Sequence, residues 1–142
     1  MADISNGINI SEICQKAVKT AASGGWVLDY TPDSVLSLEQ LLDGQRKYAK
    51  ESGARDVYLW NLAVIFGVYL GQTLLHNRLA DLGYSWSAGD DGVPFLKKDN
   101  DNAIYPVNKV WKRLRGDKSD NVRSFYDVSV AIAEGRLKLG KE

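Results

Sequence analysis

Histidine and cysteine, which often serve as catalytic bases, nucleophiles or metal ligands, each occur once in this chain of 142 residues, as His76 and Cys14. A Ser–His or Cys–His catalytic site would therefore have to use His76. No serine stands in the G-x-S-x-G context of a nucleophile elbow, and His76 follows a long apolar segment, where a cation at a helix C-terminus is favoured. We interpret His76 as a helix-end residue and Cys14 as a small buried apolar residue, and we expect no disulfide and no metal site.

One catalytic arrangement stays open. If the long uncharged segment forms a central helix that meets a small sheet, four polar and aromatic side chains could converge at that junction: Tyr69, Gln72, His76 and Trp86. An enzyme with an unrecognised site would place its chemistry there. The lack of a recognisable catalytic set favours a protein that is not an enzyme and that uses no cofactor.

The acidic residues form no recognisable site. Glu39 and Asp43 lie one helical turn apart, and we expect both to face solvent rather than a pocket that would tune an acid/base pair. The run from Asp99 to Asn102 resembles the start of a calcium loop, but Ile104 and Val110 stand where that loop needs glycine and glutamate. No glycine-rich phosphate-binding motif is present.

The clearest charge signal is a basic segment near residues 109–118, which contains Lys109, Lys112, Arg113, Arg115 and Lys118. On a helix, Lys109, Lys112 and Arg113 share one face, and we expect that face to be solvated. The alternative is a surface for phosphates, nucleic acid or an acidic protein, with Trp111 stacking on a base rather than packing in the core. Because 18 basic residues balance 18 acidic ones, the chain as a whole does not have the strongly basic composition of a protein that packages nucleic acid.

Periodicity and caps predict three N-terminal helices. The first runs from Ile10 to Ala22 with Asn9 as its N-cap. The second starts either at Thr31-Pro32 or at Ser37, and Ser52-Gly53 stops it. The third and most apolar helix runs over residues 57–82, is ended by Gly83 and forms the centre of the fold.

Short strands and two further helices follow. We expect strands at Tyr84–Ser87, Val93–Lys97 and Ala103–Tyr105, with Pro94 making the second an edge strand or delaying its start. A helix at Val107–Arg115 precedes a last helix that Ser119 caps and Gly135 ends. The prediction is a single α+β domain over residues 1–142, with frayed ends near 1–8 and 136–142.

The uncharged stretch from Val57 to Leu75 is long enough to cross a membrane. Asn61 and Gln72 lie inside it, and a helix enclosed by other helices is also apolar all round, so we favour a core helix and no membrane contact. Small residues one turn apart, as in Gly67-x-x-x-Gly71, permit close approach of another backbone in either setting. The first seven residues lack the basic and apolar regions of a secretory signal, so we expect a cytoplasmic protein.

The segment Phe66-Gly67-Val68-Tyr69-Leu70-Gly71-Gln72 resembles a "gaYlGE" signature of small uncharacterised bacterial proteins. The run from Pro106 to Gly116 is similar to their "P-x-x-K-V-x-K-R-L-x-x-G" motif, and Ser124-Phe125-Tyr126 to their "sFy" helix. The resemblance covers about residues 28–132 and implies an α+β fold of unknown function. Gln72 stands where these proteins usually have glutamate, so an ionic role at this position would be reduced to hydrogen bonding.

We therefore expect a cytosolic bacterial binding or accessory module, of the immunity type, that recognises a protein partner. Four tryptophans and seven tyrosines are many for this length, and some of them would mark a contact surface. The expected surface is the hairpin Tyr84–Lys97 together with the helix Val107–Arg115. Nucleic-acid or phosphate binding through the basic segment is the second hypothesis and the enzyme site is the third; the sequence sets no oligomeric state.

Overall fold

The first two helices begin where their capping residues predict. In the computed structural model, which describes residues 9–116 and 120–136, helix α1 spans Ile10–Ser23 and helix α2 spans Pro32–Ser52. The Glu12 N–H donates to Asn9 Oδ1 at 3.0 Å, and the Ser34 N–H donates to Thr31 Oγ1 at 3.2 Å. These bonds satisfy N–H groups that have no partner in the first helical turn. The alternative start of α2 at Ser37 is therefore wrong.

The central helix α3 spans Asp56–Asn77 and is shorter than predicted. The α-helix is interrupted at Arg78, whose φ of −154° is not helical, and the chain continues as the 3₁₀ helix η1 at Leu79–Leu82. Asn77 accounts for the break, because its Nδ2 donates both to the Thr73 carbonyl within the helix and to the Tyr30 carbonyl outside it. Gly83, with a φ of 97°, ends η1 in the left-handed conformation that glycine tolerates best.

Helix α3 is the core of the fold. By length and composition it could cross a membrane, but 61% of its most apolar stretch is buried inside the protein. It packs most extensively against α4 (Pro106–Arg115), and also against α1 and α2. Burial under other helices is the packing expected for the core helix of a water-soluble domain. Phe66, Tyr69 and Leu70 on α3 are fully buried.

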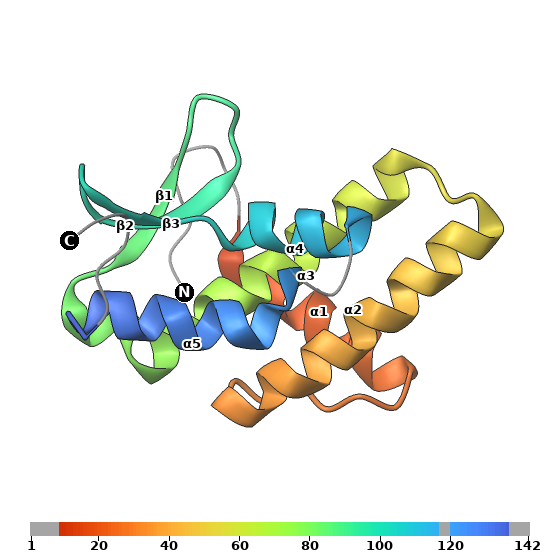
Figure 1. Cartoon of the computed structure of the whole chain (residues 1–142), viewed down its shortest axis with the longest axis horizontal. Coiled ribbons are helices and arrows are strands. Elements are labelled where there is room, and N and C mark those ends of the chain that lie inside the picture. Colours follow the sequence, from red (N-terminus) through yellow and green to blue (C-terminus); the bar gives the residue numbers. More distant parts are fainter. Residues whose placement is uncertain (1–8, 117–119, 137–142) are drawn as a thin grey trace.

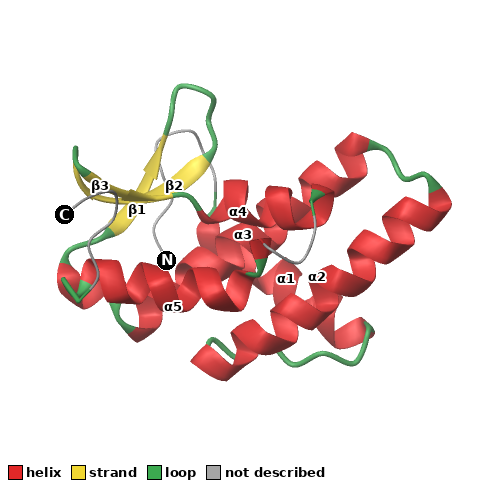
Figure 2. Cartoon of the chain, in the orientation of Figure 1, coloured by secondary structure: helices red, strands yellow, loops and turns green. Residues whose placement is uncertain are grey.

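Three short strands form an antiparallel meander at one end of the helical layer (Figure 2). Strand β1 (Ser85–Ala88) pairs with β2 (Pro94–Asp99), and β2 pairs with β3 (Asn102–Ile104). Strand β2 is therefore central rather than an edge, and Pro94 is accommodated as its first residue. The connection between α2 and α3 lies at the far end of the molecule from the sheet (Figure 1).

The last helix, α5, spans Val122–Ala133. Asn121 caps it by accepting a hydrogen bond from the Ser124 N–H at 3.0 Å, so the prediction that the helix is capped two residues earlier is wrong. Ser119 itself lies outside the described residues, as do the predicted frayed segment 1–8 and all of the predicted frayed segment 136–142 except Arg136. The order of three helices, a meander and two helices confirms the predicted α+β fold.

Candidate functional site

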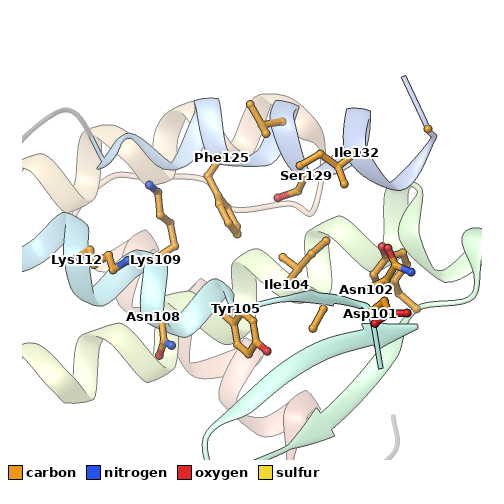
Figure 3. A pocket seen from close by; sticks show the side chains of 14 residues that line it. Asp101, Asn102, Ile104, Tyr105, Asn108, Lys109, Lys112, Phe125, Ser129 and Ile132 are labelled. Atoms are coloured by element: carbon orange, nitrogen blue, oxygen red, sulfur yellow. The ribbon is translucent and has the colours of Figure 1, made fainter. Parts of the chain in front are cut away.

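An open groove of about 810 Å³ lies between the sheet edge and the two C-terminal helices (Figure 3). Strand β3 and the start of α4 form one wall, and α5 forms the other. The residues that line the groove are Tyr84, Asp101, Asn102, Ala103, Ile104, Tyr105, Asn108, Lys109, Lys112, Phe125, Val128, Ser129, Ile132 and Gly135. This volume falls within the range of ordinary ligand sites.

The walls of the groove follow from helix and turn geometry. Phe125, Ser129 and Ile132 recur at helical spacing on α5, so their side chains share the face directed at β3 and α4 (Figure 3). Pro106 occupies the first turn of α4, where a missing N–H costs nothing. Just before it, the Tyr105 ring stacks on Phe95 with centroids 5.1 Å apart and stays half exposed.

The two ends of the groove differ in charge. Lys109 and Lys112 of α4 lie at one end. Asp101 of the β2–β3 turn and Asn102, the first residue of β3, lie at the other (Figure 3). Lys109 Nζ is 3.2 Å from Asp120 Oδ1 and 5.9 Å from the centre of the Phe125 ring, so its charge is partly neutralised. Lys112 is exposed and has no ion pair among the residues that the structure describes.

Arg113 does not belong to this surface. Its side chain is fully buried; Nε donates to Glu39 Oε2 at 2.8 Å and Nη2 donates to Asp43 Oδ1 at 2.8 Å. Glu39 Oε1 also accepts the Val122 N–H at the start of α5, so this cluster joins α2, α4 and α5. The guanidinium holds the pKa of the Asp43 carboxyl below its usual value. The predictions that Arg113 lies on a solvated face and that Glu39 faces solvent are wrong. Asp43 is partly exposed and also pairs with Lys47, 3.3 Å away.

Arg115 and Trp111, two other residues of the basic segment, also contact other parts of the protein. Arg115 Nη1 donates to Asp56 Oδ1, and its guanidinium lies 5.3 Å from the Trp111 ring centre. Trp111 in turn meets Trp60 of α3 edge to face, with centroids 5.3 Å apart. Trp111 therefore packs against the central helix, as the core interpretation predicts, and is not a free stacking platform.

The four residues of the hypothetical enzyme site are only partly brought together. Trp86 Nε1 donates to Gln72 Oε1 at 3.0 Å, which joins β1 to α3. Tyr69 is fully buried, and its hydroxyl accepts the Tyr30 N–H at 2.8 Å. His76 is exposed near the end of α3, with its ring centre 6.3 Å from that of Tyr30.

A second cavity, of about 470 Å³, does lie beside Gln72 and His76. Its lining consists of Ser11, Cys14, Gln15, Asp29, Tyr30, Gln72 and His76. Burial raises the pKa of the Cys14 thiol to about 11 and that of the Tyr30 hydroxyl to about 12. At neutral pH both groups therefore keep their protons, and neither is an activated nucleophile.

Comparison with known proteins assigns no function to this chain. The chain matches no family model, no curated protein and no solved structure at a significant level. The resemblance carried by the segments around Tyr69 and Lys109 stays a prediction.

The larger groove differs in part from the predicted surface. The predicted surface was the hairpin Tyr84–Lys97 together with the helix Val107–Arg115. Lys109 and Lys112 of that helix line the groove, but of the hairpin only Tyr84 does, and β3 and α5 form much of the walls. Tyr105, Phe125 and Val128 were not predicted as site residues. Of the three, only Phe125 belongs to the apolar stripe of α5, and that stripe equally indicates core packing.

The hydrogen bond between Gln72 and Trp86 can be tested by two substitutions of Gln72. Gln72→Leu should lower the free energy of unfolding by about 1–2 kcal/mol, because the indole N–H loses its acceptor in a partly buried place. Gln72→Glu should keep most of the stability, since a carboxylate oxygen also accepts this hydrogen bond. Urea unfolding followed by tryptophan fluorescence measures both changes; equal losses would show that the acceptor is not what matters.

Proposed function

We propose that this protein is a non-enzymatic binding module that recognises a protein partner through the groove between β3, α4 and α5. The observation that carries the proposal is the groove itself, which combines apolar walls with polar and charged groups at its rim. Its half-exposed Tyr105 and Val128 are apolar surface that a partner would cover. An immunity-type or accessory protein that acts in the bacterial cytoplasm, by binding and masking another protein, is the form of this function that we favour.

The phosphate or nucleic-acid hypothesis has less support. Arg113 is buried, and Lys109 and Arg115 already pair with Asp120 and Asp56, so few cations in the described part of the basic segment are free to contact phosphates. Binding of this kind would weaken steeply as salt is added. A partner held mainly by the apolar walls of the groove would be much less sensitive to salt.

Site-specific photo-crosslinking in the native host tests the proposal. A benzoylphenylalanine placed at Val128 faces the groove, and the same residue at Val57 is exposed on α3 away from it. We expect a discrete crosslinked protein from position 128 and none from position 57. The purified partner should then bind the wild-type protein and bind the Val128→Trp variant at least ten-fold more weakly, because the indole fills the groove.

The outcome against the proposal is equally specific. If positions 128 and 57 gave the same products, or if position 128 gave none, the groove would not be the recognition surface. Both valines are exposed on helices, at 44% and 62%, so neither substitution should disturb folding and each serves as the matched control of the other.

A further inference from the structure

We propose that the occupant of the groove is an extended peptide segment of the partner, which adds as a strand to the free edge of β3 and places an acidic side chain beside Lys112. This inference rests on the proposed function and gives the chemistry of what the groove binds. Three observations carry it: the strand edge, the charge at the two ends and the spacing of the apolar side chains on α5.

The backbone of β3 provides the first argument. The sheet order β1-β2-β3 leaves one side of β3 without a neighbouring strand in the described part of the chain. All three residues of β3, Asn102 to Ile104, line the groove. Unpaired N–H and C=O groups along an edge strand are a ready template for an extended peptide. Because β3 is short, the backbone adds few hydrogen bonds, and the side-chain contacts must supply the rest of the affinity.

The charges provide the second argument. Lys112 is the exposed cation at the α4 end, whereas the neighbouring Lys109 is already committed to Asp120. Asp101 is exposed at the opposite end, in the turn before β3. A segment with an acidic residue at one end and a basic residue at the other would complement both ends and would bind in one direction only.

The apolar wall provides the third argument. Phe125, Val128 and Ile132 line the groove from α5, opposite β3. A strand seated on β3 points every second side chain to the same side. Apolar residues at alternate positions of the segment would therefore meet the α5 wall, and the residues between them would face away from it.

Selection from a phage-displayed library of random ten-residue peptides tests this inference on the purified full chain. We expect the enriched peptides to share an acidic residue next to two or more apolar residues at alternate positions. Lys112→Glu should weaken a synthetic copy of such a peptide by about ten-fold or more, because an attractive charge pair becomes repulsive. Replacing the acidic residue of the peptide with lysine should restore binding to the Lys112→Glu variant.

Two controls separate the parts of this result. Lys19→Glu on α1 makes the same change in net charge at an exposed position away from the groove and should leave peptide affinity unchanged. N-methylation of the peptide backbone at every second residue should abolish binding, whereas N-methylation of the residues between them should be tolerated, as strand addition requires.

Each contrary outcome has one meaning. Some selected peptides could bind in the groove, as shown by loss of binding to the Val128→Trp variant, and yet lack an acidic residue or tolerate N-methylation at every position. Such peptides would overturn the inference and leave the proposed function standing. A photo-crosslinked partner that binds without any extended segment, through a helix or a folded surface, would overturn it as well. Failure of the crosslinking at position 128 would instead remove the proposed function.

Discussion

Replacing Gly67 with alanine should lower the free energy of unfolding by about 3 kcal/mol, a large effect for one added methyl group. A Cβ at this position would lie 2.5 Å from Val107 Cα and 3.0 Å from Val107 N, both backbone atoms of α4. Backbone cannot rotate aside as a long side chain can, so α4 must move away from α3 as a unit. The contact between α3 and α4 is the most extensive between helices, and opening it exposes buried surface. Urea unfolding followed by circular dichroism measures the change.

Gly44→Ala in α2 is the matched control. No atom lies within 4 Å of a Cβ at this position, and alanine is the better helix former, so this variant should be more stable than the wild type by about 0.5–1 kcal/mol. The opposite signs of two identical substitutions would isolate close packing as the cause. If Gly67→Ala changed stability by less than about 0.5 kcal/mol, the two helices would not be in contact at Gly67.

The close packing at Gly67 also shows what the sequence could and could not predict. Small residues one turn apart predict that another helix packs closely at that point. The spacing is the same for a lipid-embedded helix and for a core helix, and it does not identify which helix packs there. The cap Asn9 was predicted correctly, and Thr31 was one of two candidates for the start of α2, because a cap depends only on residues within one turn of it. The end of α3 was not predicted correctly, because Asn77 binds the Tyr30 carbonyl, which lies far back in the chain.

The basic segment was misjudged for the same reason. Charge spacing on α4 groups Arg113 with its basic neighbours, but its partners Glu39 and Asp43 lie about 70 residues earlier. One signal of its burial was available. Glu39 falls at helical spacing with Val35, Leu38 and Leu42, which are all buried on α2, so a carboxylate on that stripe implied a buried cation elsewhere.

The groove was the least predictable feature. Its two walls, β3 and α5, are separated by all of α4, and no local pattern states that they face each other. Val128 is exposed on α5, whereas Ser129 beside it is buried against the same groove. Periodicity identifies the stripe to which such residues belong, but only the packing of α5 on the rest of the fold decides which part of the stripe stays open to solvent.

Arg113→Met should destabilise the protein by about 3–5 kcal/mol, because it removes one partner of a buried ion pair and leaves the other. Methionine fills much of the volume of the arginine stem, so the loss would come mainly from the carboxylates: Glu39 loses its cation, and Asp43 keeps only Lys47. Glu39 is only 7% exposed, and its remaining partner is the backbone N–H of Val122. Loosening of Glu39 should therefore also weaken the start of α5, which faster amide hydrogen exchange at Val122 would report.

Arg115→Met, on the same helix, removes the same charge from an exposed ion pair and is the control for the buried one. Arg115 pairs with Asp56, but the two side chains are 46% and 72% exposed, so this variant should lose no more than about 1 kcal/mol. The pH dependence of stability gives a second test. The hydrogen bond from Arg113 lowers the pKa of Asp43 below its ordinary value of 3.8. The stability that ionised Asp43 contributes is therefore fully present above pH 3.8 and is lost as the pH falls through the lowered pKa. The stability gap between wild type and Arg113→Met should therefore be widest near neutral pH and shrink below about pH 4. A gap of constant size across that range would mean that lost packing, and not the buried ion pair, holds α2, α4 and α5 together at this point.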